Sequence, residues 1–316
     1  METSSGSALE RTLGCLVISV FSTVYYTAVL YPVSAVVLLY KYPDGGPWWF
    51  SYLYWVPYIV SVLAPPMYLP RVLGSYLCKC VLKYFDFEQI NECSDDALVE
   101  IEKERKIIYA VQPHGVVSVA GICGGIDIAP GDIPPTGVAS VIMKLPVLKH
   151  VVGSFGLVDA SSASLTRTLK KKSIVLYIGG MAELFLSSAT EERLYIAKRK
   201  GFIKLAMRTG SEVVPLYYFG NTTCMEVLRL PLLSWLSRKV GVSLTIMWGR
   251  WGLPIPLPRK CMIARGKPLG IPQKDFPTDE DVNKYHALYM AEVQRLFDQY
   301  KKRVPAYVNK KLLLDT

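Results

Sequence analysis

The stretch Gln112-Pro113-His114-Gly115 follows a run of apolar residues and contains one of the three histidines of the chain. Histidine changes its charge near neutral pH, so it can remove a proton from a substrate under physiological conditions. A histidine that only caps a turn between two elements would fit this position equally well. Taken alone, these four residues leave both roles open.

Two further groups of residues follow an apolar, strand-like run in the same way. They are Gly179-Gly180-Met181-Ala182-Glu183 and Phe219-Gly220-Asn221. In α/β proteins with parallel sheets, ligands bind at the carboxyl ends of the strands. We therefore expect His114, Glu183 and Asn221 to surround a common pocket.

The elements that must position these residues are predicted from hydrophobic periodicity. Strands are expected at residues 106–111, 138–143, 173–178, 212–219 and 261–264. Helices are expected at residues 162–172, at 202–209 and after Thr278, where Thr278 and Asp281 resemble a capping box. Strands that alternate with helices predict an α/β domain with a largely parallel sheet flanked by helices.

The first 70 residues differ in composition from the rest of the chain. No charged residue occurs from Thr12 to Tyr40 or from Gly45 to Pro70. An uncharged run of about 20 residues can cross a bilayer as a helix. We therefore predict two membrane segments, 12–40 and 46–70, that form a membrane-embedded helical hairpin.

The second segment is less regular than the first. Pro57 interrupts it, and tryptophan and tyrosine residues gather at its start, as in an interfacial aromatic belt. The sequence leaves open whether this segment spans the membrane or dips into it and returns. Two complete spans would place the N-terminal tail (1–11) and the domain at 71–316 on the same side.

Charge separates the chain at the same boundary. The whole chain carries a net charge of +10, whereas residues 1–70 carry −1. The positive-inside rule and the cations Arg71, Lys79 and Lys83 predict that the tail and the domain at 71–316 are cytosolic. A basic domain suits membrane lipids or a phosphorylated ligand. No nucleic-acid-binding motif is present, so we expect no nucleic-acid partner.

The cysteines and histidines also restrict the class of protein. The seven cysteines are irregularly spaced, which is typical of reduced cytosolic thiols rather than of a disulfide framework. The histidines do not pair with cysteines at zinc spacing, so we expect no metal site. Asn221-Thr222-Thr223 matches a glycosylation sequon that should stay unmodified in a cytosolic domain.

Several segments, in order along the chain, resemble the type-2 diacylglycerol acyltransferase family, which includes monoacylglycerol and wax-alcohol acyltransferases. The family pattern His-Pro-His-Gly corresponds to Gln112-Pro113-His114-Gly115, and Gly-Gly-x-x-Glu corresponds to residues 179–183. Further matches are Arg199-Lys200-Gly201-Phe202, Val214–Gly220 and Gly249–Pro256. The resemblance covers roughly residues 75–315. It departs at Gln112, where the family has histidine, and at Asn221, where glutamate commonly stands.

The resemblance implies transfer of a fatty acyl group from acyl-CoA to a lipid hydroxyl, with acyl-CoA as co-substrate and no cofactor. The implied fold is glycerolipid-acyltransferase-like, and the implied location is the endoplasmic reticulum membrane with the catalytic domain facing the cytosol. Diacylglycerol is the expected acceptor and triacylglycerol the product. Monoacylglycerol or a fatty alcohol is the alternative acceptor, and Gln112 motivates a non-catalytic, lipid-binding alternative. Formation of a homo-oligomer and movement to lipid droplets stay open.

This reaction needs a base, because the pKa of an acceptor hydroxyl is far above neutrality. We assign His114 as the general base and Glu183 as the acid that orients the imidazole and stabilises its protonated form. Related glycerolipid acyltransferases carry an aspartate five positions after the histidine, where Val119 stands here. Alternatively, Glu183 is an acidic residue at the N-terminus of a helix, where the helix dipole stabilises its negative charge.

The other site residues are assigned to substrate binding. Backbone N–H groups in the glycine-rich turns are candidate donors to the oxyanion, and a helix beginning at Gly201 would attract the phosphates of CoA. The set comprises Gln112, Pro113, Gly115, Gly179, Gly180, Arg199, Lys200, Gly201 and Asn221. A covalent route through Ser118 or Cys123 is the alternative to direct transfer.

Overall fold

A seven-stranded sheet forms the centre of the protein. The computed structural model describes residues 6–44, 46–180, 183, 188, 190–228 and 245–314. In spatial order the strands are β1 (Glu88–Asn91), β10 (Met262–Arg265), β7 (Glu212–Phe219), β2 (Ile107–Gln112), β5 (Ile174–Tyr177), β3 (Thr136–Val138) and β4 (Leu157–Asp159). Only the β10–β7 pair is antiparallel within this sheet, which confirms the predicted largely parallel arrangement.

One predicted strand is largely wrong. The run at 138–143 contributes only Val138 to β3, and Ile142–Lys144 forms a 3₁₀ turn instead. Residues after Val138 have no neighbouring strand to pair with on this side, because β4 ends at Asp159, opposite Val138. The other four predicted strands are present, with ends that move by one residue at most.

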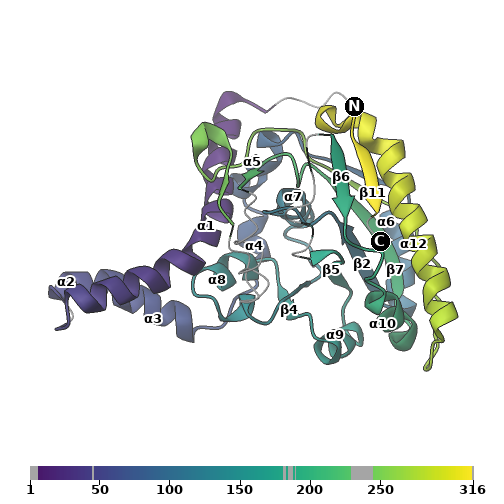
Figure 1. Ribbon diagram of the computed structural model, residues 1–316, viewed down its shortest axis with the longest axis horizontal. Helices are drawn as coiled ribbons and strands as arrows, with labels where there is room; N and C mark the ends of the chain where they lie inside the picture. Colours follow the sequence, from purple (N-terminus) through teal and green to yellow (C-terminus); the bar gives the residue numbers. More distant parts are fainter. Residues whose placement is uncertain are drawn as a thin grey trace.

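Two small sheets lie beside the central one. The first pairs β6 (Glu191–Leu194) with β11 (Lys311–Leu314) in parallel, and the second pairs β8 (Glu226–Val227) with β9 (Met247–Trp248) antiparallel. None of these short strands is evident from hydrophobic periodicity. Their pairing brings segments distant in sequence to the margins of the central sheet (Figure 1).

Helices cover both faces of the central sheet (Figure 1). One face carries α9 (Ser162–Leu169), α10 (Gly201–Thr209) and α12 (Asp279–Tyr300). The other carries α1 (Ala8–Lys41), α5 (Tyr76–Tyr84), α6 (Asp95–Glu104) and α7 (Val119–Ile128). The helix α12 begins with the predicted capping box, in which the Thr278 side chain accepts a hydrogen bond from the Asp281 amide.

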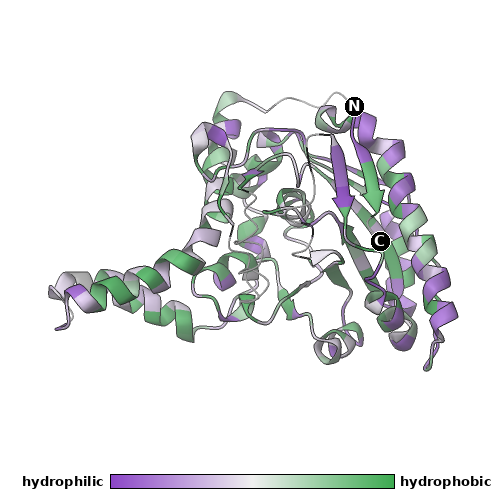
Figure 2. Ribbon diagram, viewed as in Figure 1, coloured by the Kyte–Doolittle hydropathy of each residue, from purple (hydrophilic) through white to green (hydrophobic). Residues whose placement is uncertain are grey.

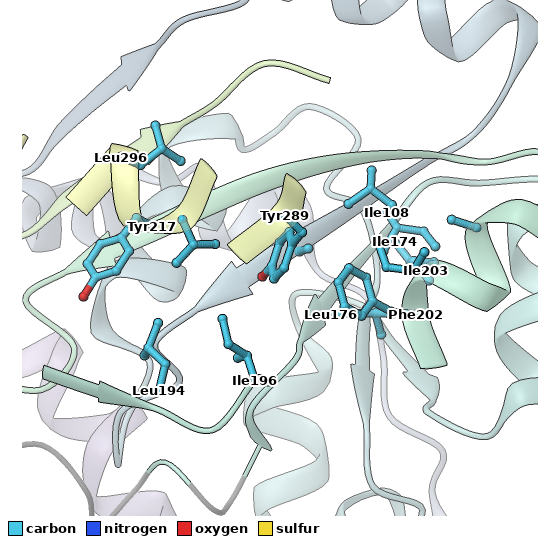
Figure 3. Close-up of a cluster of buried hydrophobic side chains, with 14 of the residues drawn as sticks. Ile108, Ile174, Leu176, Leu194, Ile196, Phe202, Ile203, Tyr217, Tyr289 and Leu296 are labelled. Atoms are coloured by element: carbon cyan, nitrogen blue, oxygen red, sulfur yellow. The ribbon is translucent and has the colours of Figure 1, made fainter. Parts of the chain in front are cut away.

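Side chains of the central strands alternate between these two helical layers, as the pleat requires. On β2, Ile108 and Ala110 belong to the core under α12, and Figure 3 shows Ile108 near Tyr289 of that helix. Ile107 and Val111 point the other way, into the core under α7. Burial on both faces explains why these strands are continuously apolar rather than alternating.

The N-terminal helix α1 belongs to the domain for the first part of its length. Cys15, Ile18 and Phe21 are buried in the core under α7, and this part of α1 packs against α5. Tyr26 ties the helix to β9, because its hydroxyl donates to the Met247 carbonyl and accepts from the Met247 amide. The part of α1 up to Tyr26 is therefore packed against the domain.

Beyond Tyr26, α1 projects from the domain together with α3 (Val56–Leu63), and both helices are rich in apolar residues (Figures 1 and 2). Tyr31 stacks on Tyr54 and Tyr58, with ring centroids 5.5 and 5.3 Å apart. Large apolar side chains are exposed here, namely Val29, Leu30, Val33, Val36, Val37, Leu39, Trp48, Trp49, Leu53, Val56, Ile59, Val60, Val62 and Leu63. We call this projecting part of the chain the apolar hairpin (residues 29–63).

The return limb of the apolar hairpin is irregular, as Pro57 suggested. It consists of α2 (Trp48–Phe50), a π-helical turn at Ser51–Trp55 and α3. At its base, α8 (Leu148–Gly153) receives the end of α3, where Lys149 donates to the Val62 carbonyl and His150 donates to the Ser61 carbonyl. Among the described residues, one helical stretch, Ala8–Thr27, is long and apolar enough to cross a membrane.

Candidate active site

Three loops meet at one edge of the sheet because β2, β5 and β7 are parallel neighbours. Val111 pairs with Tyr177 and Gln112 pairs with Tyr217, so the residues that follow each strand emerge side by side. The Asn221 side chain donates to the His114 carbonyl at 3.1 Å, and the Glu183 carboxyl accepts from the His114 amide at 3.2 Å. The three residues therefore lie together as predicted, but they do not surround a common pocket, because His114 lines the main cavity described below and Glu183 and Asn221 line the smaller one.

The His114 imidazole is held in one tautomer by its neighbour. Its Nδ1 lies 2.6 Å from the Gly115 carbonyl oxygen, which can only accept a hydrogen bond. The ring hydrogen must therefore sit on Nδ1, and Nε2 keeps its lone pair. Burial lowers the pKa of His114, although the Gly115 hydrogen bond acts in the opposite direction. A neutral imidazole with a basic Nε2 is the form that general-base catalysis needs.

Glu183 acts on the backbone of His114 rather than on its ring. Its Oε2 accepts from the His114 amide and its Oε1 from the Tyr195 amide, both at 3.2 Å. The predicted contact with the imidazole is thus corrected, because the ring uses Nδ1 on Gly115 instead. Glu183 is only 2% exposed, and burial raises its pKa to about 8 despite these hydrogen bonds. A carboxyl that is largely uncharged at neutral pH cannot supply negative charge to an imidazolium.

The turn at Gly179-Gly180 makes room for this carboxyl group. A Cβ atom on Gly179 would lie 1.9 Å from the Glu183 carboxyl carbon, so any larger residue would displace Glu183. Gly180 has a φ of +59°, a region that L side chains rarely adopt, and it lines the main cavity. These two glycines therefore serve different purposes: the first leaves space and the second shapes the cavity wall.

Asn221 stabilises the loop that carries His114. Its Oδ1 accepts from the Ala120 amide at 2.8 Å, and its Nδ2 lies 2.9 Å from the Pro113 carbonyl and 3.2 Å from Ser118 Oγ. The side chain is 1% exposed, so it has no free group for a substrate and no access for a glycosyl donor. Asn221 thus supports the His114 loop from outside the main cavity and lines only the smaller cavity described below.

Gln112 lies on the opposite face of the sheet from His114. It is fully buried, and its Nε2 donates to the Tyr289 hydroxyl of α12 at 3.0 Å, while its Oε1 has no partner among the described residues. It lines neither of the two cavities described below. The predicted substrate contact by Gln112 is therefore corrected. Strand alternation directs this side chain to the α12 core, and Pro113 only begins the turn.

Arg199, Lys200 and Gly201 lie outside the cavities. They are exposed at the start of α10, where Lys200 donates to Asn283 of α12 at 2.7 Å. None of the three is among the described residues that line a cavity. The structure therefore places this basic group outside both cavities, which sequence order alone did not indicate.

The main cavity lies between the sheet and α1, α7 and α8. Its volume is about 1130 Å³, and apolar side chains dominate its wall. Phe21, Tyr25 and Val29 of α1 line it where the apolar hairpin leaves the domain, and His114 lines it at the sheet edge. The sequence did not indicate this role of α1, because a helix predicted to be a membrane segment was not expected to line a cavity of the domain.

Ser118 and Tyr177 also line the main cavity beside His114. The Tyr177 ring centroid is 4.7 Å from that of His114, and its hydroxyl lies 2.6 Å from Ser118 Oγ. Sequence reasoning considered Ser118 only as a nucleophile and missed Tyr177. The available signal was its position at the end of a predicted strand, two residues before Gly179.

A smaller cavity of about 460 Å³ lies on the other side of the His114 loop. Gly115, Val116 and Glu183 line it together with the cations Arg259 and Lys310. Lys310 is buried and forms an ion pair with the buried Glu192 at 3.4 Å. Val116 lines both cavities, so the loop that follows His114 separates an apolar space from a polar one.

Comparison with known proteins finds relatives that match most of the chain. The chain is 33% identical to human 2-acylglycerol O-acyltransferase 3 over 66% of this chain and 68% of that protein. It is 28% identical to human diacylglycerol O-acyltransferase 2 over 63% of this chain and 58% of that protein. The Dictyostelium discoideum diacylglycerol O-acyltransferase 2 is 30% identical over 73% of this chain and 74% of that protein.

Among solved structures, the 1-acyl-sn-glycerophosphate acyltransferase PlsC from Thermotoga maritima aligns with a TM-score of 0.45. That alignment has 15% identity and covers 92% of this chain and 97% of that one. The sequence model of the family described as diacylglycerol acyltransferase matches residues 50–315, which include every element around the two cavities except α1. The chain therefore belongs to the diacylglycerol acyltransferase family.

Proposed function

We propose that this protein is a membrane-bound acyltransferase that moves a fatty acyl group from acyl-CoA to the free hydroxyl of diacylglycerol. The observation that carries the proposal is the His114 imidazole, which has a basic Nε2 and lines a large apolar cavity. Family membership supports acyl transfer to a glycerolipid. The volume of the cavity is suited to lipid chains, since it exceeds the usual range of pockets for small ligands.

The residues of the site suggest direct transfer. The acceptor hydroxyl binds near His114 Nε2, which removes its proton as the oxygen attacks the thioester carbonyl. Glu183 and Asn221 hold the backbone on either side of His114 and thereby fix the direction of the ring. The thiolate of CoA then leaves. Arg199, Lys200 and the start of α10 at Gly201 are exposed and basic, which suits CoA phosphates that remain outside the cavity.

The apolar hairpin would anchor the domain in the membrane. Its helical stretches Val29–Lys41 and Tyr52–Leu63 have 13 and 12 residues, at most about 20 Å of helix, whereas the hydrocarbon core is about 30 Å thick. These lengths favour a hairpin that enters one leaflet and returns. Val29 lies at the base of the apolar hairpin and also lines the main cavity. Lipid acceptors would therefore enter the cavity directly from the bilayer.

Monoacylglycerol is the second candidate acceptor. A relative with 33% identity is a 2-acylglycerol O-acyltransferase, whereas human diacylglycerol O-acyltransferase 2 is 28% identical. An assay with both acceptors decides between them. Membranes from cells that lack neutral-lipid synthesis, with and without this protein, would receive radiolabelled acyl-CoA and diacylglycerol, monoacylglycerol or a fatty alcohol. Labelled triacylglycerol in the pelleted membranes supports the proposal, and absence of every labelled ester rejects it.

We expect the pH dependence of kcat/KM to have an acidic limb below the ordinary histidine pKa of about 6.5. The active form is the neutral imidazole, and burial lowers the pKa of His114, so activity persists to a lower pH than for an exposed histidine. Initial rates between pH 5 and pH 8 measure this limb. Samples returned to pH 7 after each incubation must regain full activity, and a limb centred above 6.5 contradicts the assignment.

We expect Gln112→His to change kcat/KM by less than about tenfold, which corresponds to 1.4 kcal/mol in the barrier. Gln112 faces α12 and contacts Tyr289, so the substitution adds no group to the cavity. The measurement is the same acyl-transfer assay on wild type and variant. Inactive wild type with activity restored by Gln112→His would instead support a non-catalytic, lipid-binding protein.

A further inference from the structure

Tyr177 and Ser118 form a hydroxyl pair next to the proposed base. Tyr177 is the last residue of β5, and Ser118 directly precedes α7, so two rigid elements hold the pair. Their oxygens are 2.6 Å apart, and both residues line the same cavity wall as His114. The Tyr177 ring packs against the imidazole with an interplanar angle of 57°. The two rings therefore border the same part of the main cavity.

Counting hydrogens shows that the pair keeps one donor free. The Oδ1 of Asn221 accepts from the Ala120 amide, which directs its Nδ2 toward Ser118 Oγ as a donor. The two hydroxyl groups share one hydrogen bond, although together they carry two hydrogens. One O–H therefore remains unused by the described residues around it. When Ser118 donates to Tyr177, the unused hydrogen is on the phenol of Tyr177, a residue that lines the main cavity.

A glycine of α7 leaves the space that this pair occupies. A Cβ atom on Gly121 would lie 2.3 Å from the Tyr177 hydroxyl and 2.6 Å from Ser118 Oγ. Any other residue at position 121 would therefore displace the hydroxyl pair. This observation is independent of the hydrogen bonds, and it indicates that the helix is shaped around the two oxygens.

We propose that Tyr177 is a catalytic hydrogen-bond donor that stabilises the negative charge on the thioester carbonyl oxygen during acyl transfer. This inference rests on the proposed acyltransferase function. Hydrogen-bond donors that are positioned in advance around a developing oxyanion are among the largest contributors to catalysis. The adjacent rings of Tyr177 and His114 would place donor and base on the two reacting oxygens, one on the carbonyl and one on the acceptor hydroxyl.

The step balances without a further reactant. The acceptor oxygen forms a bond to the carbonyl carbon, its proton moves to His114 Nε2, and the carbonyl π electrons move to the oxygen that Tyr177 contacts. When the carbonyl reforms, the C–S bond breaks and the CoA thiolate takes the proton from His114. Tyr177 keeps its own hydrogen throughout, and burial raises its pKa well above neutrality. The products are an ester and free CoA.

The test is Tyr177→Phe, which keeps the ring against His114 and removes only the hydroxyl. We expect kcat to fall by about 10²- to 10³-fold, with KM changed by less than about threefold, because the contact strengthens only in the transition state. Ser118→Ala should cause a smaller loss, and the double variant should lose no more than Tyr177→Phe. Tyr84→Phe is the matched control. The hydroxyl of the buried Tyr84 donates a hydrogen bond to the Pro256 carbonyl, and Tyr84 lines neither cavity.

The outcomes separate this inference from the proposed function. Active wild type with inactive His114→Ala but unchanged Tyr177→Phe would overturn the role of Tyr177 and leave the acyltransferase function intact. A raised KM with unchanged kcat would also overturn it, since Tyr177 would then only bind substrate. If Tyr177→Phe does not fold, Ser118→Ala and Gly121→Ala each disturb the pair while keeping the phenol. A fall in kcat for both supports the inference, and unchanged kcat for both overturns it.

Discussion

His114→Ala is expected to lower kcat/KM for acyl transfer by about 10²- to 10⁴-fold, the usual contribution of a positioned general base. The Nδ1 of the imidazole donates a hydrogen bond to the Gly115 carbonyl, so Nε2 is the nitrogen that can accept a proton. Without it, the acceptor hydroxyl keeps its proton and attacks the thioester poorly. Initial rates with labelled acyl-CoA and purified membranes measure the effect.

The matched control is His150→Gln, because His150 also donates through Nε2 to a backbone carbonyl, that of Ser61, and lines neither cavity. We expect this control to retain the wild-type rate. Added imidazole should restore part of the activity of His114→Ala, a result that a merely structural role for His114 would not produce. Full activity of His114→Ala would refute the assignment of the base.

Asn221→Asp is expected to destabilise the protein by at least about 2 kcal/mol and to reduce activity more than tenfold. The substitution keeps the shape of the side chain and the acceptor for the Ala120 amide. It replaces the Nδ2 donor with a carboxylate oxygen that faces the Pro113 and His114 carbonyls, which are acceptors themselves. The loop that carries His114 would have to move to relieve this repulsion.

Thermal unfolding and the acyl-transfer assay, carried out on the same preparations, measure the two effects of Asn221→Asp. Asn283→Asp is the matched control, because it makes the same chemical change at an exposed position of α12. We expect this control to unfold within a degree or two of the wild type, as surface substitutions usually do. An unchanged unfolding temperature for Asn221→Asp would show that the loop does not depend on the amide.

Much of the fold was predictable because its signals are local. The predicted strand at 212–219 coincides with β7, and Thr278 caps α12 as expected. The strand at 138–143 failed because strand length depends on the partner, and β4 ends opposite Val138. The short pair of β6 and β11 joins residues more than a hundred positions apart, so neither strand has a local signature.

The candidate site was predictable as a set of positions but not as a set of contacts. Parallel strands direct their following loops to one edge, so His114, Glu183 and Asn221 could be grouped from the sequence. Which atom each side chain touches depends on a few ångströms of backbone geometry. Glu183 reaches the His114 amide rather than the ring, and Gln112 reaches Tyr289 rather than the cavity.

The sequence by itself determined the α/β class, the positions of the loops that carry His114, Glu183 and Asn221, the apolar N-terminal segments and the resemblance that family membership confirms. These properties follow from hydrophobic period, turn residues and short motifs, all of which act over a few residues. Only the tertiary structure decided that part of α1 walls the main cavity, that Gly115 sets the tautomer of His114 and that Tyr177 stands beside it. Those relations arise from packing between segments far apart in the chain, and no local pattern encodes such contacts.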